Sequence, residues 1–209
     1  MNDAHGGRIS ERHVKAGRGD GPGLALLLAA FFLSGFAALV YQTVWQRMLG
    51  MFAGSDSVTA AIVVGAFLLG LGVGTLAASL IADRLTIRQA VLGFALCEIG
   101  VALFALASRA FLYDFVVVEL APVISNRWAV FFLCFLGLLV PTFLMGMSLP
   151  ILTKAVVSSI DNAARRIGWL YGLNTLGAGV GTLVGGWYLI GSYGYEATIH
   201  VAAVLNGLA

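Results

Sequence analysis

The run GAFLLGLGVGTLAASL, residues 65–80, decides the fold class of this chain, because it is apolar, uncharged and rich in small side chains. Its centre, GVGTL at residues 72–76, occurs again at residues 179–183 inside a second apolar run. The offset is 107 residues (179 minus 72), and it also pairs the basic Arg47 with the basic Lys154. A match at fixed separation favours two related halves, as in membrane proteins with inverted repeats. Convergence is the alternative, since small residues recur wherever membrane helices pack closely.

The composition indicates an integral membrane protein. Hydrophobic residues make up 60% of the 209 residues and charged residues only 11%, whereas a soluble domain carries about 25% charged residues. A membrane-spanning helix needs about 20 apolar residues, so the sequence predicts an all-α bundle of about six transmembrane helices. The last run is too short to cross a bilayer, which favours a lost continuation beyond Ala209. We expect a disordered tail over residues 1–22, a transmembrane domain over 23–209, and spans near residues 24–46, 57–82, 88–108, 129–153, 167–190 and 196–209, the last one incomplete.

The distribution of charge predicts the topology. The net charge is only +2, which is too small to argue for nucleic-acid binding. Of the 12 Lys and Arg residues, all except Arg47, Arg109 and Arg127 lie before span one, between spans two and three, or between spans four and five. By the positive-inside rule these connections and the amino terminus are expected in the cytoplasm, with the protein in the inner (cytoplasmic) membrane.

Cysteine and histidine give no sign of a bound group. Cys97 and Cys134 both lie within apolar runs, where a thiol behaves as a small hydrophobic side chain. The three histidines have no ligand spacing among themselves or with the cysteines. The sequence therefore predicts no disulfide, no metal and no other cofactor.

Aromatic residues mark the expected membrane interfaces. Tyr41 and Trp45 lie near the outer end of span one, and Tyr188 and Tyr193 near the outer end of span five. Tyrosine and tryptophan concentrate at membrane–water boundaries, so we interpret these residues as interface anchors. The longest connection, residues 108–128, mixes aromatic and charged residues and is predicted to lie along the outer interface.

Small residues form a stripe along two of the predicted helices. They recur at four-residue intervals and therefore share one helix face. Small side chains along a face let another helix approach closely, so we interpret the stripes as helix-packing interfaces. The stripe residues are Ala66, Gly70, Gly74 and Ala78 in span two, and Gly177, Gly181 and Gly185 in span five.

Four segments carry a resemblance to a known family. They are FLSGFAALVYQTVWQRML (32–49), GAFLLGLGVGTLAASLIADRL (65–85), PTFLMGMSLPIL (141–152) and RRIGWLYGLNTLGAGVGTLVGG (165–186). In order and spacing they resemble the membrane domain of fused major facilitator superfamily/spermidine synthase proteins. The charged turn Ala-Asp-Arg after span two also resembles the loop found in one half of a facilitator transporter, although Ser79, Ile81, Thr86 and Ile87 depart from that loop.

The resemblance implies a 3+3 inverted repeat similar to one half of a major facilitator transporter. In the fused relatives a soluble polyamine aminopropyltransferase domain accompanies the membrane domain. No segment outside the apolar runs is long enough to build such a core, so aminopropyl transfer by this chain alone is not expected. In facilitator folds spans two and five face the opposite half. The two stripes are therefore expected to contact a second copy of the chain or another membrane protein.

Glu98 is the most informative single residue for function. It lies about ten positions into span three, and so roughly 15 Å from the expected cytoplasmic face. Charged groups at that depth are costly and often functional. The carboxylate could bind a cation or carry a proton, or it could be a buried acid that fixes helix packing. The sequence leaves both readings open.

Other polar residues inside the spans extend this candidate site. Gln42 and Gln46 are one turn apart on one face of span one and could border a polar cavity. Arg47 could pair with Glu98, although snorkelling to the outer interface is favoured. Asn174, inside span five, is expected to form a hydrogen bond to another helix, since an amide in lipid needs a partner.

A charge cluster is expected at the cytoplasmic ends of the spans. One interpretation is a solvated cluster that sets topology and contacts anionic headgroups. The other is an interhelical lock similar to the facilitator loop. The cluster consists of Asp83, Arg84, Arg88, Lys154, Arg165 and Arg166.

Three functions follow from these observations as hypotheses. The first is a multi-pass membrane module that anchors or scaffolds partner proteins in a membrane complex. The second is a half-transporter that dimerises and moves a small cation such as a polyamine, or a proton-coupled solute, with Glu98 in its cavity. The third is the membrane part of a polyamine aminopropyltransferase. All three place the chain in a lipid bilayer, without nucleic acid.

Overall fold

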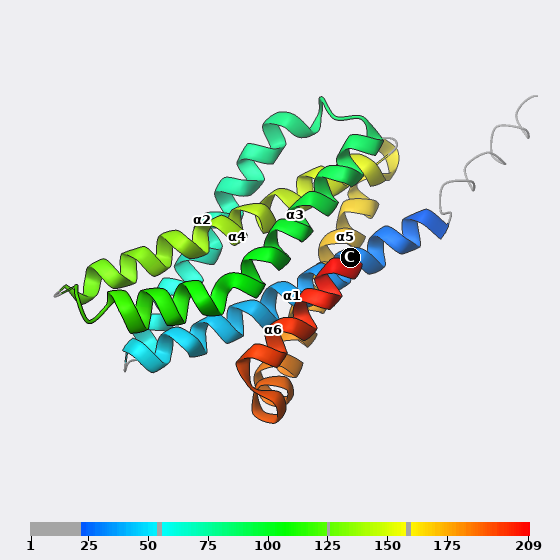
Figure 1. Cartoon of the computed structure of the whole chain (residues 1–209). Coiled ribbons are helices and arrows are strands. Elements are labelled where there is room, and N and C mark those ends of the chain that lie inside the picture. The colour runs from blue at the N-terminus through cyan, green and yellow to red at the C-terminus, as the bar shows by residue number, and fades with distance from the viewer. Residues whose placement is uncertain (1–21, 54–55, 125, 158–159) are drawn as a thin grey trace, which may run out of the picture.

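The computed structural model of the protein describes residues 22–53, 56–124, 126–157 and 160–209, and every regular element in these ranges is a helix. The expected disordered tail lies, apart from Pro22, outside the described residues. The helices, in chain order, are α1 (Pro22–Ala53), α2 (Asp56–Ala82), α3 (Ile87–Ser108), η3 (Arg109–Leu120), α4 (Arg127–Val156), α5 (Ile160–Leu183), η4 (Val184–Leu189) and α6 (Ile190–Leu208). Figure 1 shows them as one bundle, in which α4 contacts α2 and α3 while α1 contacts α5 and α6.

Four helical stretches are long and apolar enough to cross a membrane. They are Gly23–Met51, Ser57–Ala82, Ile87–Leu120 and Trp128–Val156. The sequence predicted six spans. The two expected spans near residues 167–190 and 196–209, which correspond to α5 with η4 and to α6, are not among these four. The glycines and Asn174 of α5 lower its mean hydropathy, and α6 carries Glu196 and His200. An all-helical fold with four apolar helices of membrane-spanning length is thus established.

The third apolar helix is longer than expected. Residues 108–128 were predicted to be a connection along the interface, but α3 continues directly into the π-helical η3 and ends only at Leu120. Phe111 and Leu112 extend the apolar face of α3, and Leu112 is fully buried. A second irregularity lies in α6, where Gly194 has φ 76° and interrupts the helix. Glycine adopts this left-handed conformation without the steric cost of a Cβ.

The stripe of span two packs against α4 within the same chain. A Cβ added to Gly74 would lie 2.1 Å from the carbonyl oxygen of Phe143, and one added to Gly70 would lie 1.9 Å from Oγ1 of Thr142. Gly146 of α4 also makes a close contact, since its Cβ would lie 2.4 Å from the carbonyl oxygen of Leu71. Ala66 and Ala78 are fully buried. Backbone-to-backbone contact of this kind stabilises membrane helix pairs through dispersion forces.

The stripe of span five packs in the same manner against α1. A Cβ on Gly177 would lie 2.1 Å from the carbonyl oxygen of Phe32, and one on Gly181 would lie 2.3 Å from that of Phe36. Gly185 follows, with the side chain of Val40 at 3.1 Å from its Cβ position. The expectation that the two stripes face an absent half is therefore corrected. These small side chains are used for packing inside the chain, because only glycine allows such close helix approach.

Two groups of buried side chains fill the bundle at different depths. One gathers around Tyr41 and Trp45 of α1, with Phe67 of α2 and Leu112 of η3. The other lies near the beginning of α1, where Phe31 contacts Phe94 of α3 and is joined by Leu152 and Leu170. Glu98 lies on α3 one turn beyond Phe94 and is 3% exposed. The carboxyl group is thus enclosed by packed helices on a rigid element.

Candidate functional site

The carboxyl group of Glu98 joins three helices. Its Oε1 accepts hydrogen bonds from Oγ of Ser34 on α1, at 2.9 Å, and from Oγ of Ser148 on α4, at 3.1 Å. The carbonyl oxygen of Glu98 accepts a further bond from Nδ2 of Asn206 on α6, at 2.7 Å. We call Ser34, Glu98, Ser148 and Asn206 the Glu98 cluster. All four residues are buried, so the cluster ties α1, α3, α4 and α6 together in the interior.

Short polar side chains suit this position. A buried polar group costs free energy unless it has a hydrogen-bond partner. Serine places a hydroxyl close to the helix backbone, so Ser34 and Ser148 reach Glu98 without holding the helices apart. The sequence reasoning identified Glu98 but not the other three members. The available signal was that each is a polar residue inside an apolar run, although only the tertiary contacts reveal that they meet.

Tyr41 and Trp45 are core residues rather than interface anchors. Both are 0% exposed, and their rings stack with centroids 5.6 Å apart. Trp45 also meets Phe104 of α3 edge-on, at 5.7 Å. The interpretation of these two residues as part of an aromatic belt is therefore wrong. Their large aromatic rings instead fill the space between the helices of the bundle. The hydroxyl of Tyr41 and the indole Nε1 of Trp45 have no hydrogen-bond partner among the described residues.

The expected aromatic pair near the end of span five does lie at the surface. Tyr188 and Tyr193 are both more than half exposed, and their rings meet edge-on at 6.0 Å. They come from η4 and from the first turns of α6, on either side of Ile190. Both rings are thus available at the surface, and their role as interface anchors stays a prediction.

Arg47 is directed to η4 and not to Glu98. Its Nη2 donates a hydrogen bond to the carbonyl oxygen of Gly186, at 2.9 Å. On α1 it follows Ser34 by 13 residues (47 minus 34), which is about 20 Å along the helix axis. The weaker of the two sequence interpretations, a pair between Arg47 and Glu98, is thus contradicted. The nearby Gln42 and Gln46 are half-buried on α1.

Asn174 lies at the contact between α5 and α1. A Cβ added to Gly35 would lie 2.2 Å from the carbonyl oxygen of Asn174 and 2.6 Å from its Oδ1. Gly35 directly follows Ser34, so the close approach of α5 and the hydrogen bond to Glu98 occur at the same level of α1. Asn174 therefore belongs to a helix-packing contact beside the Glu98 cluster.

The predicted charge cluster is brought together only in part. Nζ of Lys154 donates a hydrogen bond to the carbonyl oxygen of Asp83, at 3.2 Å, which links the end of α4 to the turn after α2. Arg84 and Arg88 are exposed. Arg165 and Arg166 line a cavity between α1 and α5, and Nη1 of Arg166 donates to the carbonyl oxygen of Val156 at the end of α4. The end of α4 thus contacts both the turn after α2, through Lys154, and α5, through Arg166.

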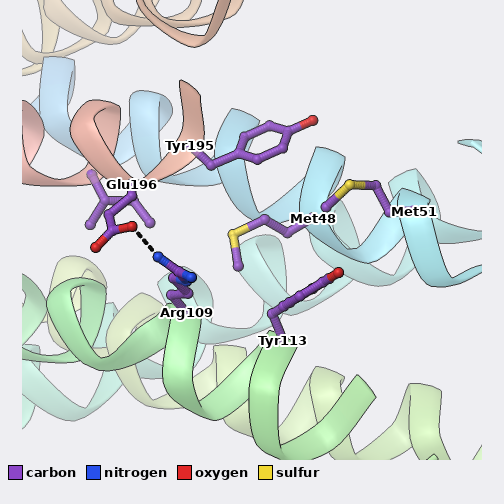
Figure 2. A pocket seen from close by; sticks show the side chains of 7 residues that line it. Met48, Met51, Arg109, Tyr113, Tyr195 and Glu196 are labelled. Atoms are coloured by element: carbon purple, nitrogen blue, oxygen red, sulfur yellow. Dashed lines mark hydrogen bonds and ion pairs between the residues drawn. The ribbon is translucent and has the colours of Figure 1, made fainter. Parts of the chain in front are cut away.

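A separate cavity lies where α1, η3 and α6 meet, and Figure 2 shows it from close by. Its volume is about 330 Å³. Arg109 of η3 and Glu196 of α6 form an ion pair across it, and both side chains are about half exposed. Such exposed pairs contribute only about 0–1 kcal/mol. The lining residues are Met48, Met51, Arg109, Tyr113, Tyr195, Glu196 and Ile199.

The described residues contain no group of three or more His, Cys, Asp or Glu side chains placed to hold a metal ion. No family model, curated protein or solved structure matches the chain. The site must therefore be interpreted from its own geometry. That geometry consists of a buried carboxyl group held by hydroxyl and amide donors, and of glycine contacts that close the neighbouring helix pairs.

Proposed function

We propose that the chain is a multi-pass membrane module that anchors or scaffolds partner proteins in a membrane complex. The observation that carries this proposal is the internal use of Glu98, whose Oε1 accepts from Ser34 and Ser148 and so joins α1 to α4 through α3. A carboxyl group occupied in this way stabilises a fixed helix arrangement. The outer faces of the helices then remain available to bind partner proteins.

The exposed side chains of the bundle support the same proposal. Leu76 of α2 is 68% exposed and Leu183 of α5 is 67% exposed, on faces away from the glycine contacts. The offset of 107 residues relates these two leucines (183 minus 76). In a bilayer such faces contact lipid or another membrane protein. We propose that a second membrane protein, or a second copy of the chain, covers them in the complex.

We further propose that the bundle is six membrane helices built as a 3+3 inverted repeat, as the resemblance to a facilitator half implies. The paired glycine contacts support it. Gly74 meets the carbonyl oxygen of Phe143, and Gly181 meets that of Phe36. The offset of 107 relates Gly74 to Gly181 and also Phe36 to Phe143 (143 minus 36). The same contact thus occurs twice, once with the glycine in the first half of the chain and once with the glycine in the second half. Chance convergence of small residues would not require this correspondence.

The charge distribution supports an inner-membrane location with the amino terminus in the cytoplasm. The resemblance to fused spermidine synthase-like proteins supports a partnership with an aminopropyltransferase, as one specific form of the scaffold. Any such activity would reside in the partner domain.

A half-transporter is the second candidate, and one observation favours it. The hydroxyl of Tyr41 and the indole N–H of Trp45 are buried polar groups without a hydrogen-bond partner among the residues described. Tyr41 follows Ser34 of the Glu98 cluster by about two helical turns, and Trp45 by about three. Polar groups of this kind could serve a solute that moves along α1 between their level and that of Glu98. On this alternative a dimer would move a small cation, and Glu98→Gln would abolish uptake into proteoliposomes without changing the amount of folded protein.

Photocrosslinking in native membranes tests the scaffold. A photoreactive amino acid is placed at Leu76 or at Leu183, and as a control at Leu138, which is 0% exposed. We expect both surface positions to capture the same discrete partner band, and the core position to give only products within the chain. Capture of lipid alone at both surface positions would contradict the proposal.

A further inference from the structure

A cleft opens between the first two turns of α1 and residues 165–173 of α5. Its volume is about 410 Å³. The wall from α1 is apolar, and the wall from α5 carries two arginines followed by apolar residues. We call this site the α1–α5 cleft. Its lining residues are Leu24, Ala25 and Leu28 from α1, and Arg165, Arg166, Trp169 and Leu173 from α5.

The end of the glycine stripe explains why the cleft exists. Gly185, Gly181 and Gly177 contact α1 at successive turns of α5. The next positions in this four-residue series, toward the start of α5, are Leu173 and Trp169. These side chains are too large for the close approach that glycine allows, so the two helices separate. The opening is therefore a consequence of the sequence pattern.

The described residues that line the cleft carry a positive charge, from Arg165 and Arg166. No Asp or Glu is found among the described residues that line it. Arg166 is half-buried, and its Nη1 donates to the carbonyl oxygen of Val156, which holds the guanidinium group at the wall. Arg165 is exposed at the mouth. Guanidinium groups bind phosphate through paired, geometrically matched hydrogen bonds.

The remaining lining selects an amphipathic ligand. Leu24, Leu28 and Leu173 give an apolar wall that continues from the arginines toward the interior of the bundle. Trp169 is 60% exposed at the same level, a position that suits its ring at a membrane–water interface. A free phosphate ion would use the arginines but not these apolar side chains.

We propose that the α1–α5 cleft binds one anionic phospholipid. Its phosphate group contacts Arg165 and Arg166, and the beginning of an acyl chain lies against Leu24, Leu28 and Leu173. Basic pockets between membrane helices on the cytoplasmic side are suited to anionic headgroups. The charge distribution assigns this end of the bundle to that side. The bound lipid would fill the space that the large side chains keep open between the two helices.

Native mass spectrometry of the full chain, released from mixed nanodiscs, tests this site. The nanodiscs contain equal amounts of dioleoyl phosphatidylglycerol and dioleoyl phosphatidylcholine, so that only the headgroup differs. We expect one phosphatidylglycerol retained per chain, at least tenfold more often than phosphatidylcholine. Arg165→Gln should lower this retention about fivefold, the effect expected for one basic residue at an anionic membrane surface. Equal retention of the two lipids would overturn the proposal.

Two further variants separate the cleft from general surface charge. Arg88→Gln removes an exposed arginine outside the cleft lining and should leave retention unchanged. Leu24→Trp keeps both arginines but obstructs the apolar wall, and should lower retention as much as Arg165→Gln. Folding of each variant is checked by circular dichroism and elution volume. An equal loss with Arg88→Gln, or full retention with Leu24→Trp, would contradict a built site.

Soluble anions distinguish a lipid from a free ligand. Millimolar inorganic phosphate and glycerol phosphate are added during thermal unfolding of the detergent-solubilised chain. We expect neither to raise the unfolding midpoint, whereas phosphatidylglycerol raises it by a few degrees in the wild type and not in Arg165→Gln. Stabilisation by phosphate equal to that by phosphatidylglycerol would overturn the assignment to a lipid.

Discussion

A carboxyl group inside a membrane helix is costly, and its surroundings decide what it does. At Glu98 the surroundings are Ser34 and Ser148, both donating to Oε1, and Asn206, which donates to the backbone carbonyl of the same residue. Each donor comes from a different helix. The residue therefore acts first as a junction of helices, and any solute-binding role would have to use an oxygen atom of a carboxyl group already engaged in packing.

Substitutions at Glu98 test this role in stability. Glu98→Gln keeps a carbonyl oxygen that can accept from Ser34 and Ser148, so we expect the free energy of unfolding to change by less than about 1 kcal/mol. Glu98→Leu leaves both hydroxyls without this acceptor and should cost about 1–3 kcal/mol. Unfolding by sodium dodecyl sulfate in mixed micelles measures the difference. An equal loss for both variants would mean that the negative charge, and not hydrogen bonding, is what the bundle requires.

Arg47 gives a second test at the same scale. It binds the carbonyl oxygen of Gly186, about 20 Å along α1 from the Glu98 cluster. A double-mutant cycle with Arg47→Gln and Glu98→Gln should give additive changes in stability, within about 0.5 kcal/mol. A coupling of 1 kcal/mol or more would show that the two charges communicate.

At the scale of elements, the bundle rests on two close helix pairs, α2 with α4 and α5 with α1. In each pair glycines place backbone against backbone. Hydrophobic burial does not drive such pairing in lipid, because the acyl chains are as apolar as the helix surfaces. The helix pairs are stabilised instead by close packing and by a few interhelical hydrogen bonds. One of these bonds runs from Oγ1 of Thr75 to the carbonyl oxygen of Gly146, at 3.0 Å.

Each copy of the GVGTL motif has one glycine in a close helix contact and one glycine without such a contact, which serves as a matched control. Gly74→Ala and Gly181→Ala each place a Cβ within 2.3 Å of a backbone oxygen, so the helices must separate. We expect a loss of about 1–3 kcal/mol in the free energy of unfolding for each. Gly72 and Gly179 have no atom within 4 Å of their Cβ positions, and the same substitution there should be neutral. Detergent unfolding of the four variants compares them. Similar losses at all four positions would contradict the packing described.

Much of the element structure could be predicted from the sequence. Apolar length predicted the four helical stretches that are long and apolar enough to cross a membrane. The four-residue spacing predicted the faces used for packing. The partners of those faces could not be predicted, because small side chains allow any helix to approach. The same limit applied to Ser34, Ser148 and Asn206, whose meeting at Glu98 depends on tertiary contacts. Tyr41 and Trp45 were misplaced because an aromatic residue suits both an interface and a core.

At the scale of the whole molecule, the interior of the bundle is closed around the Glu98 cluster, and the outer surface is apolar. The α1–α5 cleft and the cavity beside Arg109 lie toward its ends. This arrangement suits the function proposed above, a membrane module whose outer faces would recognise lipid and protein. Such a module needs its helices fixed, which the glycine contacts and the Glu98 cluster provide.

The native mass of the chain tests this account most directly. The protein is purified from its native membrane in lipid nanodiscs, and the mass and composition of the particle are measured. The account predicts one complex in which a different membrane-associated protein is present in fixed stoichiometry, and in which Glu98→Gln leaves that stoichiometry unchanged. A homodimer without another protein, with solute uptake that Glu98→Gln abolishes, would contradict the scaffold and establish the transporter instead.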